Sequence, residues 1–261
     1  NHASIYDGCK LSYAAVQRYR HSDMADLEKR LAEIPIEAGK LIVTDGVFSM
    51  SGDIARLPDI VELAKKYRAR VMVDDAHGFG VLGPGGRGTA SYFGLMDEVD
   101  VVMGTFSKSL ASLGGFMLSS PAVAEYVRHN SRPFIFSASI PPANCASALA
   151  ALRVIDSEPE RVKRLGDLAE YYREGLHRRG IATMKAENAR VPIIPIYTYE
   201  PMRTLRINKT LYECGVYVNP VLPPATAPGE CLLRTSLMAT HTEAILDEAM
   251  DIIKEVIEHA E

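Results

Sequence analysis

A short apolar segment that runs into polar residues is the first place where this sequence could do chemistry. Residues 101–103 are apolar, Gly104 follows them, and Thr105, Ser107 and Lys108 come soon afterwards. This order predicts a buried strand that ends in a turn. A lysine on such a turn is expected to be poorly hydrated, which lowers the pKa of its amine and makes it a nucleophile for carbonyl carbons.

Two hydroxyl groups beside Lys108 add a second chemical property. Thr105 and Ser107 could donate hydrogen bonds to a phosphate group. A lysine with phosphate donors on the same loop is what a pyridoxal phosphate (PLP) Schiff base requires. Taken alone, the stretch is more typical of a surface lysine in a polar loop, so the neighbouring segments have to decide between the two interpretations.

Polar residues also follow two earlier apolar segments. Apolar runs at 40–44 and 71–74 predict buried strands, and the periodic apolar residues after Pro58 predict a helix between them. This alternation favours a mainly parallel sheet with helices on both faces. Ligands of such sheets bind at the carboxyl ends of the strands. The polar segments at those ends are 45–49, 74–77 and 105–108.

Other apolar segments are expected to extend this sheet. Residues 2–7 are expected to end a strand, and 115–118 and 134–137 to form two more. We therefore expect an α/β fold whose large domain covers residues 1–157 and contains the candidate PLP site.

A second pattern begins after this domain. Strands are predicted at 193–197 and 232–234, and a closing amphipathic helix at 242–259. These segments predict a small C-terminal α+β domain in residues 158–261.

Composition narrows the class of protein. The chain has 261 residues, 24% of them charged, and a net charge of -4, which gives no sign of a nucleic-acid or anionic-membrane partner. No apolar segment is long enough to span a bilayer and no signal peptide is present, so a cytoplasmic protein is expected. The cysteines form no CxxC pair, which favours reduced thiols over a disulfide framework or a metal site. They are Cys9, Cys145, Cys214 and Cys231.

Asp74 and His77 are the candidate partners of a cofactor ring. Asp74 ends an apolar strand, so its carboxylate needs a cationic or hydrogen-bonding partner, and a pyridinium N–H fits. Helix capping or metal binding are the alternatives, but no other acidic or histidine cluster supports a metal. His77 could bind a phenolic oxygen or transfer protons, although a lone histidine is more often structural. The glycine-rich residues 83–88 lack the ending of a phosphate-binding P-loop and are expected to be a mobile loop.

Six stretches together resemble the α-oxoamine synthases, which are PLP enzymes of fold type I. The family includes serine palmitoyltransferase, 8-amino-7-oxononanoate synthase and glycine C-acetyltransferase. Each stretch is weak alone, and the six occur in the order typical of the family. They are Asn1-His2-Ala3-Ser4, Asp45-Gly46-Val47-Phe48-Ser49-Met50, Val73-Asp74-Asp75-Ala76-His77, Gly86-Arg87-Gly88, Gly104-Thr105-Phe106-Ser107-Lys108 and Leu233-Arg234-Thr235.

The resemblance implies catalytic roles for four residues. Lys108 would form the Schiff base and later move protons. Asp74 would pair with the ring nitrogen, His77 would contact the phenolic oxygen, and His2 would stack on the ring face.

The resemblance also implies binding residues and a partner. Ser49, with Thr105 and Ser107, would hold the ring oxygen and the phosphate, and Arg234 would bind the amino-acid carboxylate. The family is homodimeric with a shared active site, so Ser137 or Ser139 of a second subunit would reach the phosphate.

The implied reaction condenses a small amino acid (serine, glycine or alanine) with an acyl-CoA. It yields an α-amino ketone, CoA and CO2. Residues 106–112 and 223–226 favour a serine palmitoyltransferase, hence sphingolipid biosynthesis. 8-Amino-7-oxononanoate synthase, which belongs to biotin biosynthesis, and glycine C-acetyltransferase remain alternatives. So does a non-catalytic homologue that acts as a regulatory subunit, while an ordinary aminotransferase is disfavoured by the contexts of His2 and Arg234.

The first residues carry a further expectation. The sequence starts at Asn1-His2-Ala3 without a methionine, whereas in the family a segment with a phosphate-binding helix end precedes this stretch. We therefore expect a truncated chain that, made alone, binds PLP weakly and is poorly soluble.

Overall fold

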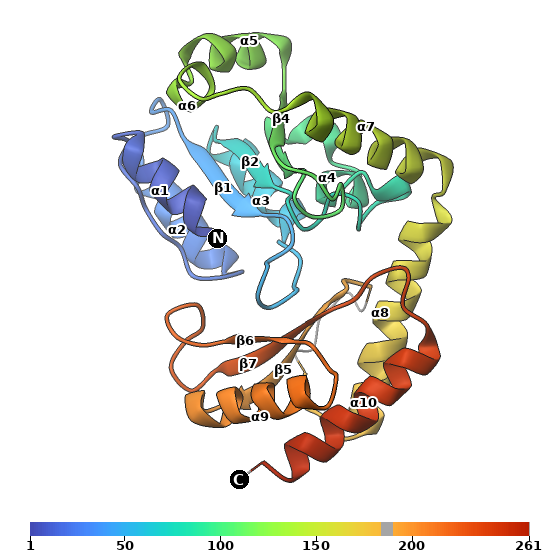
Figure 1. Cartoon of the computed structure of the whole chain (residues 1–261). Coiled ribbons are helices and arrows are strands. Elements are labelled where there is room, and N and C mark those ends of the chain that lie inside the picture. The colour runs from blue at the N-terminus through green and yellow to red at the C-terminus, as the bar shows by residue number, and fades with distance from the viewer. Residues whose placement is uncertain (184–189, 261) are drawn as a thin grey trace. The chain divides into compact units, whose positions relative to one another are not determined.

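The computed structural model describes residues 1–183 and 190–260 (Figure 1). The chain divides into two compact units. Unit 1 comprises Asn1–Phe48 and Ile54–Pro159, and unit 2 comprises Ser49–Asp53 and Glu160–Glu261. The sequence placed the domain boundary between residues 157 and 158, and it did not anticipate that Ser49–Asp53 would belong to unit 2.

Unit 1 is built on a four-stranded sheet. Its strands follow the order β1-β2-β3-β4, of which the first three run parallel and β4 runs antiparallel to β3. The predicted α/β fold with a mainly parallel sheet is therefore confirmed. The strands are β1 (Leu41–Asp45), β2 (Arg70–Asp74), β3 (Val101–Thr105) and β4 (Gly115–Ser119).

Helices α2 (Met24–Ala32) and α3 (Leu57–Lys66) share one apolar core with this sheet. The buried residues of α3 recur at helical spacing, and Pro58 lies in its first turn, where the missing N–H costs no hydrogen bond. Burial of these side chains is the main force that holds the helices to the strands. The core residues are Leu27, Leu31, Ile42, Ala55, Leu57, Ile60, Val61, Ala64, Val71, Val73 and Ala90.

Two predicted strands of unit 1 are wrong. The strand predicted at residues 2–7 is instead the start of helix α1 (Ala3–Leu11). His2 precedes this helix and caps it, because its side chain accepts a hydrogen bond from the Ser4 N–H at 3.3 Å. The strand predicted at residues 134–137 is also absent, because residues 134 and 135 end the short helix α6 (Arg132–Ile135) and the next two residues follow it. Phe134 and Phe136 are 64% and 80% exposed. Their apolar side chains resembled a buried strand in the sequence, but neither is buried.

The remaining helices of unit 1 connect these elements. They are α4 (Thr89–Tyr92), α5 (Pro121–Asn130) and α7 (Pro142–Ser157), together with the 3-10 turns η1 (Pro84–Gly86) and η2 (Met96–Glu98).

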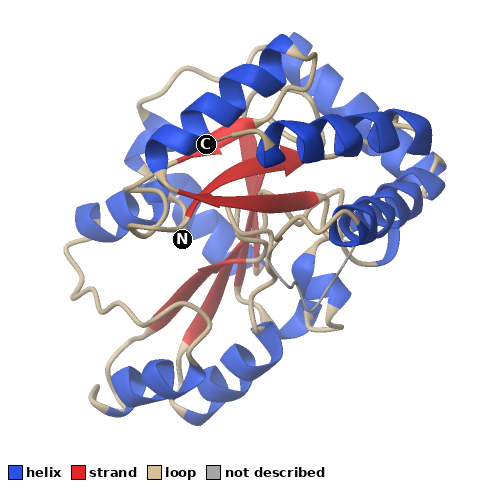
Figure 2. Ribbon diagram, turned by 90° about the horizontal axis from the view of Figure 1, so that it is seen from below, coloured by secondary structure: helices blue, strands red, loops and turns tan. Residues whose placement is uncertain are grey.

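Unit 2 is the predicted small α+β domain. Its antiparallel sheet has the order β5-β7-β6, and Figure 2 shows helices (blue) beside the strands (red) of both sheets. The strands and helices share a core that includes Leu176, Ile194 and Leu233. The elements are α8 (Glu160–Arg178), β5 (Ile193–Tyr199), α9 (Pro201–Glu213), β6 (Asn219–Val221), β7 (Cys231–Ser236) and α10 (Glu243–Glu258).

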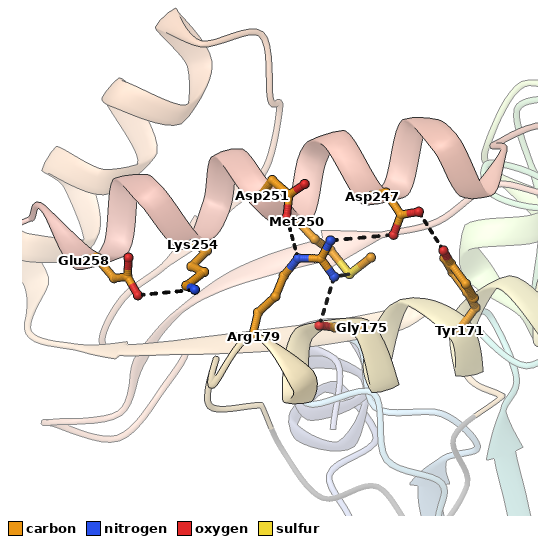
Figure 3. Close-up of polar contacts among 8 residues, drawn as sticks. All are labelled: Tyr171, Gly175, Arg179, Asp247, Met250, Asp251, Lys254 and Glu258. Carbon is orange, nitrogen blue, oxygen red and sulfur yellow. Dashed lines mark hydrogen bonds and ion pairs between the residues drawn. The ribbon is translucent and has the colours of Figure 1, made fainter.

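Polar contacts also join α8 to α10 (Figure 3). Arg179, directly after α8, donates to Asp251 at 2.7 Å and to the Gly175 carbonyl at 3.2 Å. The Tyr171 hydroxyl donates to Asp247 at 2.7 Å. Because the acidic partners are largely exposed, these contacts orient the helices while the apolar core supplies most of the stability.

Across the described ranges, no helix combines the length and the apolar composition needed to cross a membrane.

Candidate active site

The carboxyl ends of β1, β2 and β3 meet at one edge of the unit 1 sheet. Asp45 lies opposite Asp74, and Asp74 lies opposite Met103. Both aspartates are only 6% exposed. Burial raises the pKa of the Asp45 carboxyl, and the neighbouring charge of Asp74 adds to the rise. Two carboxylates are therefore held side by side with little water around them.

His2 is joined to this edge through Asp45. The His2 backbone N–H donates to Asp45 Oδ1 at 3.3 Å, and the Asn1 side chain donates to the Val43 carbonyl at 2.9 Å. The ring of His2 remains exposed. The structure thus places His2, the residue predicted to stack on the ring, at the end of β1, and β1 pairs with the strand that ends at Asp74.

Asp74 accepts one hydrogen bond at its backbone carbonyl and one at its side chain. Its carbonyl accepts the Gly46 N–H at 2.8 Å, and its Oδ1 accepts the Ala76 N–H at 3.1 Å. A carboxylate on a residue that is only 6% exposed favours a cationic N–H donor as its ligand.

His77 lies in the turn that follows β2. The Asp75 carbonyl accepts the N–H groups of Gly78 and Phe79 at 3.1 and 2.8 Å, which closes this turn around His77. His77 is partly buried. The predicted pair of Asp74 and His77 is therefore presented by one short, hydrogen-bonded segment.

Lys108 lies on the turn after β3, as predicted, but its environment differs from the expectation. Thr105 Oγ1 and Ser107 Oγ are 2.9 Å apart and share a hydrogen bond, so the two hydroxyls lie together. Leu110 is fully buried and anchors the turn. The Lys108 side chain itself is exposed, so the expectation that this residue is poorly hydrated is wrong for the chain as described.

The Lys108 turn also touches the loop that follows β2. Gly80 has a φ of 76°, and a Cβ at this position would lie 2.5 Å from Ser109 Cβ. Gly104 is equally constrained, because a Cβ there would overlap the ring of Phe116 on β4. Close backbone packing therefore sets the path of the turn that carries Lys108.

Arg234 and Ser49 are brought together within unit 2. Arg234, on β7, donates from Nε to the Ser49 carbonyl at 2.5 Å. Burial lowers the pKa of the Arg234 guanidinium, although an arginine stays charged in proteins. For its two Nη groups, the described part of the chain provides no hydrogen-bond partner, so this end of the guanidinium can bind a carboxylate.

Ser137 and Ser139 are predicted site residues that lie outside any helix or strand. Both are exposed in the connection between α6 and α7. No hydrogen bond joins either serine to another predicted site residue among the residues described.

Asp75 and Thr89 are site residues that sequence reasoning missed. Thr89 donates to the Asp75 carboxylate from its N–H at 2.8 Å and from its hydroxyl at 2.6 Å. Burial raises the pKa of Asp75 to about 6. The available signal is the glycine-rich segment 83–88 directly before Thr89, for which the sequence predicts a mobile loop.

These features define an α/β protein whose candidate site lies at the carboxyl ends of parallel strands. No cluster of His, Cys, Asp or Glu able to hold a metal ion occurs within 1–183 and 190–260. The family model described as aminotransferase class I and II matches residues 1–253. The chain belongs to this family.

Individual relatives are similar over nearly the whole chain. A serine palmitoyltransferase of Bacteroides ovatus is 49% identical over 251 residues, which are 96% of this chain and 63% of the relative. An 8-amino-7-oxononanoate synthase of Citrifermentans bemidjiense is 46% identical over 258 residues, covering 98% of this chain and 66% of the relative. A solved serine palmitoyltransferase containing PLP superimposes with a TM-score of 0.94 at 40% identity, covering 98% of this chain and 64% of that one. The chain thus spans slightly less than two thirds of the serine palmitoyltransferases that it matches.

Proposed function

We propose that the protein carrying this chain is a PLP-dependent acyltransferase that condenses serine with a long-chain acyl-CoA. The observation that carries the proposal is the 49% identity to a serine palmitoyltransferase over 96% of the chain. The reaction joins the amino-acid Cα to the acyl carbonyl carbon, and CoA and CO2 leave. The product is an α-amino ketone, which is the kind of compound expected at the start of sphingolipid biosynthesis.

The residues of unit 1 fit PLP by their donor chemistry. A buried carboxylate oxygen of Asp74 suits a pyridinium N–H, and the Lys108 amine suits an aldehyde. Thr105 and Ser107 present neighbouring hydroxyls for an anionic group. When bound, PLP withdraws electrons from the substrate Cα and stabilises negative charge there.

Four residues of unit 1 then have distinct tasks. Lys108 binds the cofactor covalently and moves a proton at the substrate Cα. Asp74 keeps the ring nitrogen protonated by its negative charge. His77 donates to the phenolic oxygen, and His2, positioned by Asp45, covers the ring face.

Residues of unit 2 bind the amino acid in this proposal. The Nη groups of Arg234 match the two oxygens of a carboxylate, and its Nε is oriented by the Ser49 carbonyl. The Ser49 hydroxyl binds the ring oxygen.

8-Amino-7-oxononanoate synthase is the second candidate, because a relative of that name is 46% identical. That product name implies alanine and an acyl chain that ends in a carboxylate. The test is CoA release by the purified full-length protein with PLP, comparing serine plus palmitoyl-CoA with alanine plus a carboxylate-terminated acyl-CoA. Faster release with palmitoyl-CoA supports the first function, and faster release with the second pair supports the alternative. Glycine plus acetyl-CoA is a third pair, which tests for a glycine C-acetyltransferase. If none of the three pairs releases CoA, the result favours the non-catalytic regulatory homologue.

The proposal includes a cytoplasmic homodimer with a shared active site. The exposed Phe134 and Phe136 lie beside Ser137, and exposed apolar side chains of this kind favour burial against a second subunit. Ser137 or Ser139 would then reach the phosphate of the other subunit. Light scattering should give the mass of a dimer for the full-length protein and a smaller mass for Phe136→Glu.

A further inference from the structure

Asp75 is a buried titratable residue for which the proposed chemistry has no use. It lies between Asp74 and His77 in the sequence and is 2% exposed. Its N–H donates to the Met103 carbonyl on β3 at 2.8 Å, and its carbonyl closes the turn around His77. The backbone of Asp75 therefore ties the end of β2 to β3 and to the turn that presents His77.

The Asp75 carboxylate makes a second connection, to the start of α4. Oδ2 accepts the Thr89 N–H at 2.8 Å and Oδ1 accepts the Thr89 hydroxyl at 2.6 Å. Thr89 is fully buried. A carboxylate removed from water is costly unless hydrogen bonds compensate, so these two bonds determine where the side chain can lie.

Three glycines leave the space that the Asp75 carboxylate occupies. A Cβ on Gly78 or Gly88 would overlap the carboxylate oxygens, and one on Gly46 would lie 2.6 Å from Oδ1. Gly46 also donates its N–H to the Asp74 carbonyl. The loops after β1 and β2 and the segment before α4 are therefore packed against the same carboxylate.

We infer that Asp75 and Thr89 are positioning residues, whose buried hydrogen bonds hold Asp74 and His77 in the orientation that binds the PLP ring. The inference rests on the proposed function, because it assigns Asp74 and His77 to the cofactor. Movement of the Asp75 carboxylate would displace the end of β2, where Asp74 lies, and the turn that carries His77. Loss of the Thr89 hydroxyl should therefore weaken cofactor binding, although neither Asp75 nor Thr89 touches the cofactor.

The test compares Thr89→Val with Thr89→Ser in the full-length protein. Valine has nearly the shape of threonine but leaves Asp75 Oδ1 without its hydroxyl donor, whereas serine keeps the donor. We expect the PLP dissociation constant, from absorbance titration, to rise about tenfold in Thr89→Val, the size of one lost charged hydrogen bond. Thr89→Ser should restore most of the affinity.

A matched control separates positioning from stability. Thr204 on α9 is also fully buried, and its hydroxyl lies 2.6 Å from that of Thr198. Thr204→Val should lower the free energy of unfolding without changing PLP affinity or the absorption maximum of the bound form. A Thr89→Val protein that loses stability but keeps wild-type PLP affinity and spectrum would overturn the inference.

Asp75→Asn gives a second measurement if Thr89→Val does not fold. The amide keeps the shape and one accepting oxygen, so PLP affinity should fall by about three- to tenfold. Unchanged affinity in this variant would also overturn the inference. If the wild-type protein binds no PLP, the proposed function fails first, and the inference fails with it.

Discussion

The loops after β2 and β3 are neighbours in the sheet but differ in their surroundings. After β2, Asp74 and Asp75 are almost completely buried, and the Asp75 carboxylate has two hydrogen bonds from Thr89. After β3, Ser107 and Lys108 are exposed, and the hydroxyls of Thr105 and Ser107 bond to one another. The difference suits their proposed tasks: a carboxylate that holds a ring must be fixed, whereas an amine that forms and breaks bonds must be reachable.

Removing the accessible amine should have the largest effect. Lys108→Ala is expected to abolish covalent PLP binding and to lower turnover about 10³-fold or more, because the same amine binds the cofactor and moves the proton. Borohydride reduction and peptide mapping of the wild-type protein should place the pyridoxyl group on Lys108. The exposed Lys209 is the control, since Lys209→Ala should keep both properties. A label on another lysine would refute the assignment.

Neutralising the fixed carboxylate should have the next largest effect. Asp74→Asn should still bind PLP covalently, but turnover should fall about 10²-fold or more, because the ring nitrogen loses the charge that keeps it protonated. Steady-state kinetics and the absorption spectrum measure the two properties separately. The exposed Asp97 offers a matched Asp97→Asn control. Turnover within a few-fold of wild type would mean that Asp74 has another task.

The burial of Asp75 predicts a pH dependence of stability. Its pKa is raised from 3.8 to about 6, so its stabilising contribution is complete below pH 4 and is lost as the pH rises through 6. Two pKa units correspond to about 3 kcal/mol. From pH 4 to pH 7 the wild-type protein should therefore lose about 3 kcal/mol of its free energy of unfolding through Asp75. The Asp75→Asn variant, which has no carboxyl group at this position, should not show this loss. Urea denaturation at several pH values measures this difference, and a constant difference would show that the carboxylate is well hydrated.

Unit 2 extends the comparison to substrate binding. Arg234→Lys keeps the charge but loses the paired Nη donors, so affinity for the amino acid should fall by about 1–3 kcal/mol. Titration of the PLP-loaded protein with serine measures the change, with Arg206→Lys on the exposed side of α9 as the control. Normal serine binding together with weaker acyl-CoA binding would assign Arg234 to the other substrate.

Several features could be predicted from local sequence. Apolar runs that end in polar residues identified β1, β2 and β3, and they placed Asp74 and Lys108 at the correct ends of their strands. Such runs are informative because a buried strand needs apolar side chains along its length and its ligands lie at its end. The six short motifs indicated the α-oxoamine synthases, and the similarity to a serine palmitoyltransferase and an 8-amino-7-oxononanoate synthase confirmed this resemblance.

Tertiary structure alone decided the rest. Residues 134–137 are as apolar as a strand but lie exposed, and residues 2–7 form a helix capped by His2, because burial and capping depend on what packs nearby. The Asp75–Thr89 pair was hidden because its members are far apart in the sequence and the glycines that enclose them act through the absence of a side chain. Local pattern determined which residues carry the proposed chemistry, whereas their hydration and hydrogen bonds depended on segments that meet only in the folded chain.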